Sequence, residues 1–493
     1  MDNRKFNDQE LIRRNQLEEL KKNNKDPFKI DKFIRNFNTT SFKKKYDKFS
    51  KEELHNSNDE IIIAGRIMAI RQTFGVIKDF YGTTQFYLNK KAVPENVFKE
   101  FKKLDIGDII GIHGIPMKTN TGQVTINVKS FTLLSKSLKP LPEKWHGLVD
   151  EEIRARHRYV DLIMNDESMQ TFVLRSKIVS LIRKFMDENG YFEVETPVLQ
   201  PILGGAAARP FITHHNTLDR EYYLRIATEL PLKKLIVGGF EKVYEIGRIF
   251  RNEGMDATHN PEFTSMEAYT AYASMEDMMD LTEKLYRYIA SCIDKMKLNY
   301  RGTEIDFSKP FKRVTMMEVI KQATNVDFNK IKTDEEAITA AKEFKLELLP
   351  HERNRGHIMA KFFDEFGEKI CQQPTFVYEY PIEVSPLAKR KTDDPKMTKR
   401  FEFFICGKEF ANAFSELNDP IDQYERFENQ LKEKDLGNDE ANEMDMDFIE
   451  ALENGLPPTA GIGYGIDRLV MLFTNNETIR NVLLFPHMKD RNK

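Results

Sequence analysis

The chain has 493 residues, of which 40% are hydrophobic and 31% are charged, and its formal net charge is −3 at pH 7. This length predicts two or three domains with a large core, and the near-neutral charge excludes a global attraction to nucleic acid. The chain lacks an apolar run long enough to cross a bilayer, an apolar secretory leader and a metal-spaced cysteine pair, so we predict a reduced, cytoplasmic protein without zinc.

Residues 1–55 form a basic extension with sparse apolar positions, which predicts polar helix. Its lysines are densest at 43–45 and at Lys48. A local basic surface can bind phosphate backbones even when the whole protein is acidic. A solvated helix face has the same composition, and composition alone favours that interpretation.

Residues 56–138 follow the order of a small β-barrel. Alternating patterns predict three strands, a helix and two further strands, at 61–71, 74–79, 84–88, 94–101, 108–115 and 123–134. This is the order of an OB-fold, a barrel that often binds single-stranded nucleic acid, although other small β domains share it. Residues 139–150 then predict a linker, because Pro140 and Pro142 follow the last strand directly.

From residue 151 to 493 the pattern becomes mixed α and β. Apolar residues repeat at helical spacing from Val173 to Met186, and Asn189-Gly190 ends that helix. A strand is predicted over 191–198. It carries Pro197, which has no amide hydrogen and therefore belongs at a sheet edge or an interface.

Two predicted strands, 242–250 and 262–272, enclose a polar loop that begins with Arg251. Alternation places the side chains of the second strand that could face this loop on one side, namely Phe263, Ser265, Glu267 and Tyr269. A hairpin with an arginine and an acid at its mouth can hold a phosphate, and Phe263 offers a flat aromatic face beside Arg251. The alternative is a surface hairpin with an Arg–Glu salt bridge, which is the commoner meaning of an isolated Arg-x-Glu.

A glycine-rich segment, 461–465, precedes Asp467, Arg468 and an apolar run. Glycine-rich backbone leading into a helix lets a ligand approach closely. Arg468 would lie in the first helical turn, beside the positive end of the helix, and could clamp a γ-phosphate. A lone glycine-rich segment is more often only a tight turn.

These segments resemble, in the family order, the three motifs of class II aminoacyl-tRNA synthetases. Residues 185–198 resemble motif 1, residues 242–272 motif 2 and residues 459–473 motif 3. From Glu60 onward the chain is most similar to the bacterial-type lysyl-tRNA synthetases of subclass IIb, in phrases such as 225–230. The resemblance implies an α+β fold in which an OB-fold barrel precedes a catalytic domain of antiparallel sheet flanked by helices. It also implies a homodimer with motif 1 at its interface.

By this resemblance the protein would activate L-lysine with ATP to lysyl-adenylate and pyrophosphate, and then transfer lysine to the 3′-terminal adenosine of tRNA(Lys). Catalysis would rest on positioning and charge neutralisation by Arg251 and Arg468 rather than on a protein nucleophile. ATP-binding roles fall on Arg251, Glu253, His259, Asn260, Phe263, Glu402 and Arg468. Lysine-binding roles fall on Gly205, Glu229, Arg251, Glu267, Tyr269, Asn412, Phe414 and Glu416. A substrate with two ammonium groups and one carboxylate does require at least two buried acids and a cation.

Glu402 and Glu409 match the metal-binding acids of the family, and Mg²⁺ with ATP is the implied ion. If Gly407-Lys408 is a two-residue turn, both acids face the same side of a hairpin. Strict alternation then places Glu409 and Asn412 on opposite faces of one strand. Because both should serve one site, we predict a β-bulge between them, or a longer turn.

The segment 396–400 looks like the lysine-rich signature of class I synthetases. The sequence contains no His-x-Gly-His partner for it, so we interpret it as a basic turn before a strand at 401–406.

In the barrel, Phe74 and Gln85 match anticodon-binding residues of the family: a ring stacks on one base and an amide reads polar edges. An aromatic residue in such a barrel is as often part of the core. The connection 71–73 is several residues shorter than in the family pattern, which puts loop contacts with the anticodon in doubt but not contacts of the sheet face.

Three alternatives stay open. The first is an aspartyl- or asparaginyl-tRNA synthetase, which would share the fold and the ATP site. The second is a non-catalytic, synthetase-like RNA-binding protein. The third is a lysyl-transferring enzyme that modifies a protein, although such relatives generally lack an OB-fold.

Overall fold

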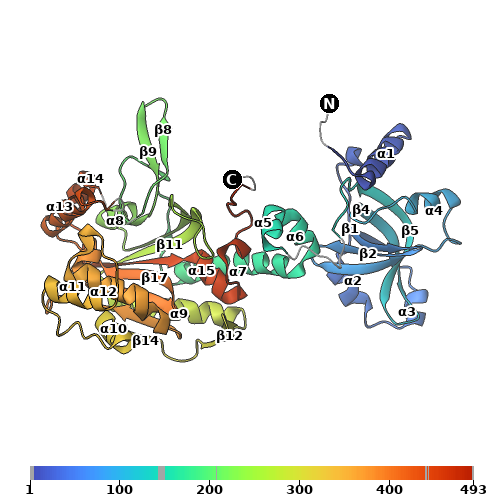
Figure 1. Cartoon of the computed structure of the whole chain (residues 1–493). Helices are drawn as coiled ribbons and strands as arrows, with labels where there is room; N and C mark the ends of the chain where they lie inside the picture. The colour runs from blue at the N-terminus through green and yellow to red at the C-terminus, as the bar shows by residue number, and fades with distance from the viewer. Residues whose placement is uncertain (1–4, 143–149, 207, 439–440, 442, 491–493) are drawn as a thin grey trace. The chain divides into compact units, whose positions relative to one another are not determined.

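The computed structural model describes residues 5–142, 150–206, 208–438, 441 and 443–490. The chain folds into two compact units, Met1–Val149 and Asp150–Lys493, here called the barrel unit and the sheet unit (Figure 1). Most of the predicted linker, at 143–149, lies outside the described residues. Within the described ranges, none of the helices combines the length and the apolar character needed to cross a bilayer.

The barrel unit is a closed five-stranded barrel with the strand order β1-β2-β3-β5-β4. Its strands are β1 (Ile61–Arg71), β2 (Phe74–Asp79), β3 (Gly82–Tyr87), β4 (Ile109–Lys118) and β5 (Val124–Ser135). Helix α4 (Glu95–Phe101) connects β3 to β4 and contributes Phe98 and Phe101 to the core. The predicted OB-fold is therefore confirmed.

The first 55 residues, where described, contain three separate helices, α1 (Asp8–Lys22), α2 (Thr39–Tyr46) and α3 (Lys51–His55), joined by irregular segments. Phe42 and Tyr46 are fully buried in the barrel core, whereas Lys43, Lys44 and Lys45 of the same helix are exposed. The basic cluster is thus the solvated face of a helix whose apolar face covers the barrel.

The sheet unit is built on an eight-stranded sheet with the order β14-β15-β16-β17-β18-β11-β10-β6. Its strands are β6 (Phe192–Glu193), β10 (Lys242–Phe250), β11 (Glu262–Ala271), β14 (Lys312–Thr315), β15 (Thr375–Tyr378), β16 (Arg400–Ile405), β17 (Lys408–Ser415) and β18 (Thr459–Gly465). The neighbours from β15 to β10 all pair antiparallel. This agrees with the predicted antiparallel framework.

Helices cover one face of this sheet and leave part of the other open. Helices α7 (Asp166–Glu188), α9 (Met275–Cys292) and α15 (Ile466–Thr474) form the main core with inward residues of the sheet such as Met266 and Ala268. Because strand side chains alternate, their neighbours on β11, including Glu267, face the opposite side. That side is only partly covered, by the cluster that includes residues of α8 (Glu229–Val237), α13 (Pro420–Asp435) and α14 (Met446–Glu453).

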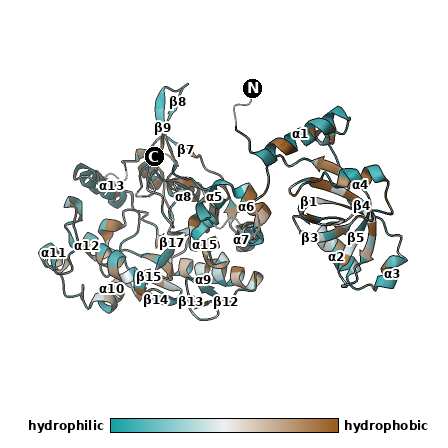
Figure 2. Ribbon diagram, turned by 45° about the vertical axis from the view of Figure 1, so that its right-hand side comes forward, coloured by the Kyte–Doolittle hydropathy of each residue, from teal (hydrophilic) through white to brown (hydrophobic). Residues whose placement is uncertain are grey.

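The other elements of the sheet unit lie around this framework. They are α5 (Glu151–Arg156), α6 (Arg158–Met164), β7 (Leu199–Gln200), β8 (Ile212–His215), β9 (Arg220–Leu224), β12 (Lys297–Tyr300), β13 (Thr303–Asp306), α10 (Met316–Thr324), α11 (Asp334–Glu343) and α12 (Arg355–Phe362). The β8–β9 hairpin projects from the body of the unit (Figure 1), and α13 is largely hydrophilic (Figure 2).

The strand predicted over 191–198 is wrong beyond its start. Only Phe192–Glu193 forms a strand, β6, which pairs parallel with β10. Thr196 turns its amide and hydroxyl to Glu245 Oε2, at 3.1 and 2.7 Å, instead of continuing the ladder. Pro197 has no amide hydrogen to offer, so the chain leaves the sheet at its edge.

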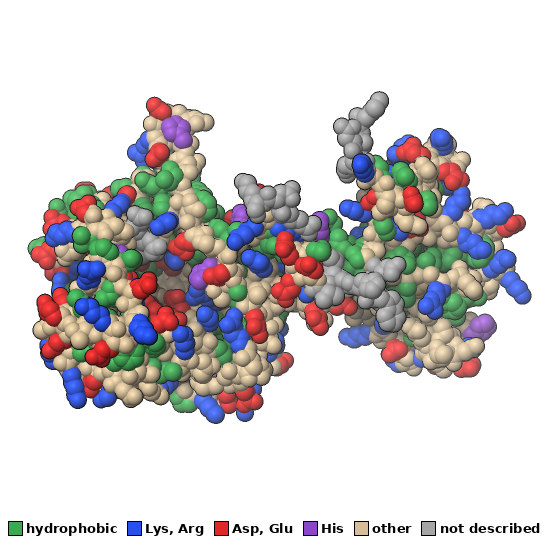
Figure 3. Space-filling view, in the orientation of Figure 1, with side chains coloured by type: hydrophobic (Ala, Val, Ile, Leu, Met, Phe, Trp, Pro, Cys, Tyr) green, Lys and Arg blue, Asp and Glu red, His purple; other side chains and the backbone are tan. Residues whose placement is uncertain are grey.

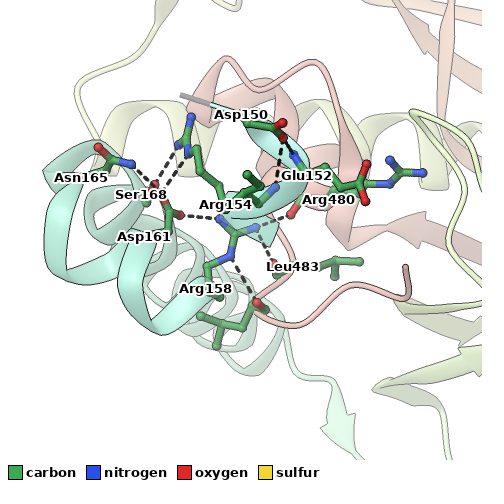
Figure 4. A network of polar contacts seen from close by, with 11 residues as sticks. Asp150, Glu152, Arg154, Arg158, Asp161, Asn165, Ser168, Arg480 and Leu483 are labelled. Carbon is green, nitrogen blue, oxygen red and sulfur yellow. Dashed lines mark hydrogen bonds and ion pairs between the residues drawn. The ribbon is translucent and has the colours of Figure 1, made fainter. Parts of the chain in front are cut away.

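A buried arginine ties the first helices of the sheet unit to its C-terminal segment (Figure 4). Arg158 is 1% exposed, pairs with Asp161 Oδ2 at 2.6 Å and donates to the carbonyl oxygens of Arg480 and Leu484. Just before this segment, the amide of Ile479 donates to the carbonyl oxygen of Ala257 at 2.7 Å. The network therefore holds the loop between β10 and β11 from the side of the C-terminal segment.

Candidate active site

A cleft of about 480 Å³ opens on the uncovered side of the large sheet. Figure 3 shows the sheet unit hollowed on this face, with acidic side chains beside the hollow. The cleft is lined by most of the residues proposed from the sequence: Gly205, Glu229, Arg251, Glu253, His259, Asn260, Phe263, Glu267, Tyr269, Glu402, Glu409, Asn412, Phe414 and Arg468. Glu416 lies just behind its wall, because a Cβ added at Gly461, which lines the cleft, would collide with Glu416 Oε1.

Two arginines from distant parts of the sequence meet in this cleft. Arg251 follows β10, and its guanidinium lies 5.3 Å from the centre of the Phe263 ring. Its Nε is buried and has no hydrogen-bond partner among the described residues. Arg468 lies in the first turn of α15, where the helix dipole adds positive potential, and its Nη1 contacts Glu409 Oε2 at 3.1 Å.

The loop after β10 contributes the more exposed part of the cleft. Glu253 and His259 are exposed, and His259 Nδ1 lies 2.7 Å from Asp256 Oδ2. Asn260 is buried and donates from Nδ2 to the carbonyl oxygen of Glu262 at 2.6 Å. Asn260 therefore shapes the start of β11 as well as lining the cleft.

The inner end of the cleft is acidic. Glu267 Oε1 accepts from the amide of Thr228 at 2.9 Å, and its Oε2 accepts from the Tyr269 hydroxyl at 3.0 Å. Burial raises the pKa of Glu267 to about 7, and the charge of Glu229 adds to the rise. Burial also raises the pKa of Glu229 and of Glu416. A cation bound here would relieve the mutual repulsion of these three carboxyl groups.

The β16–β17 hairpin contains the predicted bulge. Its two-residue turn is Cys406-Gly407, both with positive φ of 51° and 64°, and not Gly407-Lys408. Phe403 pairs with Ala411 and Phe404 with Glu409, so one residue of β17, Phe410, is extra. The bulge reverses the alternation between Glu409 and Asn412, and both line the cleft.

Glu402 and Glu409 suit a divalent cation that is shared with another ligand. Burial raises the pKa of Glu402 to about 8; Arg400 opposes this shift, and Glu409 and Asp364 add to it. The described residues contain no group of three or more His, Cys, Asp or Glu that could hold a metal ion. Two carboxylates fit Mg²⁺ whose other ligands are phosphate and water oxygens.

Arg400 is a cleft residue that the sequence interpretation missed. It is the first residue of β16, not part of a surface turn, and donates to Glu402 Oε1 at 2.6 Å and to Asn412 Oδ1 at 3.0 Å. Its guanidinium lies 4.6 Å from the ring centre of Tyr380. Alternation contained the signal, because Arg400 stands two residues before Glu402 and so shares its face.

The glycine-rich segment is a strand, β18, and not a turn. It pairs with β11 on one side and with β17 on the other, so its backbone is satisfied in the ladder. Side chains would not fit evenly along it: a Cβ at Gly461 would collide with the Tyr269 ring and Glu416. Because Gly461 has no side chain, Tyr269 and Glu416 can pack directly against the backbone of β18.

In the barrel unit, Phe74 and Gln85 lie on neighbouring strands. The Phe74 side chain is outside the core: it is 37% exposed, and its ring centre lies 4.6 Å from that of Tyr87, its cross-strand partner. Gln85 Oε1 accepts from the Thr125 hydroxyl at 2.8 Å. Tyr87 was missed, although it stands two residues after Gln85 and alternation places it on the same face.

Comparison with known proteins matches both units. The family model "tRNA synthetases class II (D, K and N)" matches residues 150–489, and "OB-fold nucleic acid binding domain" matches residues 61–134. The chain is similar over 99% of its length to lysine–tRNA ligases of Malacoplasma penetrans (62% identical), Mycoplasmoides gallisepticum (53%) and Staphylococcus epidermidis (52%). It covers 99% of each of these relatives.

Proposed function

The chain belongs to the class II tRNA synthetases of the D, K and N group, and we propose on this premise that it is a lysine–tRNA ligase. It activates L-lysine with ATP and transfers it to the 3′-terminal adenosine of tRNA(Lys). One observation carries the assignment: a single cleft contains Arg251 and Arg468 at its phosphate-binding part and three acids at or behind its inner end.

In the first step, a carboxylate oxygen of lysine attacks the α-phosphorus of ATP, the bond to the bridging oxygen breaks, and pyrophosphate leaves. Arg251 stabilises the charge that develops on the α-phosphate, and Arg468 holds the γ-phosphate. The Phe263 ring stacks on adenine, with Glu253, His259 and Asn260 around the nucleotide. Glu402 and Glu409 would hold Mg²⁺, which would neutralise part of the phosphate charge.

In the second step, the 3′-hydroxyl oxygen of the tRNA attacks the carbonyl carbon of lysyl-adenylate, AMP leaves, and the hydroxyl proton is released. The Ser265 and Tyr269 hydroxyls in the cleft lining donate to the Tyr464 carbonyl oxygen and to Glu267, and the proposed chemistry needs no enzyme-bound ester. Both steps therefore depend on how the reactants are held.

The charge of the inner end favours lysine over the related substrates. Glu229 and Gly205 face the α-amino group, and Arg251 pairs with the carboxylate. The side chain of the substrate extends along Tyr269, Asn412 and Phe414 toward Glu267 and Glu416. The Oε1 atom of Glu416 is buried without a hydrogen-bond partner among the described residues. An aspartate side chain placed here would meet like charge, which disfavours an aspartyl- or asparaginyl-tRNA synthetase.

The barrel unit supplies tRNA selectivity. Phe74 offers an exposed ring for stacking on an unpaired anticodon base, the half-buried Tyr87 packs beside it, and Gln85 lies two residues from Tyr87 on the same strand. The match to the nucleic-acid-binding OB-fold model over 61–134 supports this role.

An exposed apolar edge supports a homodimer through motif 1. Phe192 on the edge strand β6 is 63% exposed, and its ring lies 6.1 Å from that of Phe240, which is 41% exposed. Val198 and Leu199, directly after the segment that leaves the sheet, are 39% and 44% exposed. Clustered apolar side chains of this kind mark protein interfaces. Sedimentation of the wild type and of Phe192→Asp measures the assembly: a dimer is expected for the former and a monomer for the latter, and a monomeric wild type contradicts the proposal.

The decisive test of the activity is ATP–pyrophosphate exchange with each of the twenty amino acids. Exchange with lysine alone is expected. Exchange that depends on aspartate or asparagine would identify the sibling enzymes, and exchange with no amino acid would point to a non-catalytic RNA-binding protein. Lysylation of a tRNA(Lys) transcript, with no transfer to protein, separates the ligase from an enzyme that modifies proteins.

A further inference from the structure

A lysine of the protein itself lies directly behind the proposed lysine pocket. Lys233, in the middle of α8, is 0% exposed and does not line the cleft. Its Nζ lies 2.5 Å from Glu229 Oε1 and also pairs with Glu416 Oε2. The rings of Phe414 and Phe448 flank it at 5.4 and 5.6 Å. One buried ammonium group thus connects the two acids that face opposite ends of the substrate.

Lys233 contributes to the charge balance at this end of the cleft. Glu229, Glu267 and Glu416 are three buried carboxyl groups, and a free lysine brings two ammonium groups. The carboxylate of that lysine is already matched by Arg251. If all three acids are ionised, the two ammonium groups of the substrate leave one negative charge uncompensated, and Lys233, which pairs with two of the acids, supplies the missing positive charge.

We propose that Lys233 is a positioning residue that sets the charge of the pocket to that of lysine, an inference that rests on the proposed function. By pairing with Glu229 and Glu416, Lys233 opposes the rise that burial causes in the pKa of both acids and so favours their ionised forms. It also holds Glu416 through Oε2, while Oε1 lies beside Gly461, which lines the cleft. Specificity for a doubly cationic amino acid thus depends on a cation that does not touch the substrate.

Protonation gives this role a signature that a purely structural ion pair would not show. Burial alone would lower the pKa of Lys233, but Glu229 and Glu416 outweigh it and raise that pKa, so Lys233 stays charged. The groups facing the two acids are Glu267 and Tyr269 of β11, Arg400 of β16 and Lys233. Without Lys233, burial and mutual repulsion raise the pKa of Glu229 and Glu416 further, so a larger share of these acids is neutral at a given pH.

The test compares Lys233→Met with Lys234→Met. The control removes the next lysine of the same helix, which pairs with Asp447 at the surface and has a side chain that is 31% exposed. Lysine-dependent ATP–pyrophosphate exchange is measured between pH 6.5 and 9. For Lys233→Met we expect the KM for lysine at pH 7 to rise at least ~10-fold, the loss expected for one buried charged interaction, while the KM for ATP changes less than about twofold. The KM for lysine should recover as the pH rises, because the neutral acids ionise again.

Lys233→Gln serves if the methionine variant does not fold, since it keeps a hydrogen-bond donor between the acids without the charge. The same KM shift is expected, because charge and not hydrogen bonding is the proposed cause. A KM for lysine within twofold of the wild type, or parallel increases for lysine and ATP without the pH dependence, would overturn the inference. Wild-type protein that shows no lysine-dependent exchange would instead overturn the proposed function, so the two failures are distinguishable.

Discussion

Gly461 stands where the cleft is packed most tightly, and Gly461→Ala gives the sharpest test of the packing described here. A Cβ at this position would overlap both Glu416 Oε1 and the Tyr269 ring. Neither neighbour can move cheaply, because Tyr269 is 3% exposed and Glu416 is 1% exposed and paired with Lys233. Gly463 is a matched control on the same strand: the nearest heavy atom to its added Cβ is Glu267 Cγ at 3.7 Å, an ordinary contact.

Overpacking of a buried site typically costs about 1–3 kcal/mol, and we expect Gly461→Ala to lose this much stability. Gly463→Ala should change the free energy of unfolding by less than about 0.5 kcal/mol. Alanine lowers the conformational entropy of the unfolded chain, and this gain offsets any small strain in the folded protein. Circular dichroism during urea unfolding measures both variants. Gly461→Ala should also raise the KM for lysine more than that for ATP, since the residues displaced belong to the amino-acid end. Equal stability losses in the two variants would refute the reasoning.

Three further predictions concern the other parts of the site. Phe74→Ala should weaken tRNA charging and leave tRNA-independent exchange intact, because the exposed ring lies in the barrel unit; equal damage to both reactions would mean that Phe74 only packs. Chelation of Mg²⁺, or Glu402→Gln, should abolish adenylate formation, and unchanged exchange in the variant would count heavily against the metal assignment. The pKa of Glu267 is raised to about 7, so its charged form is lost as the pH falls through that value. In the wild type, kcat/KM for lysine should therefore decline below about pH 7, and a flat profile between pH 6 and 8 would contradict this.

The sequence alone determined the features that follow from the alternation of side chains along a strand. Alternation along 262–272 put Phe263, Glu267 and Tyr269 on one face, and they line one cleft. The bulge in β17 was predictable for the same reason, because Glu409 and Asn412 could serve one site only if the alternation broke between them.

Only the tertiary structure decided the contacts between residues that lie far apart in the sequence. The segment after Glu193 does not continue strand β6, because Thr196 donates its hydrogen bonds to Glu245 on strand β10. Arg400 looked like part of a basic surface turn until β16 placed it beside Asn412. Lys233 looked like any lysine on a helix, and only packing set it between Glu229 and Glu416. Burial and electrostatic coupling arise from contacts between elements far apart in sequence, whereas local patterns report only which way a side chain points along its own strand or helix.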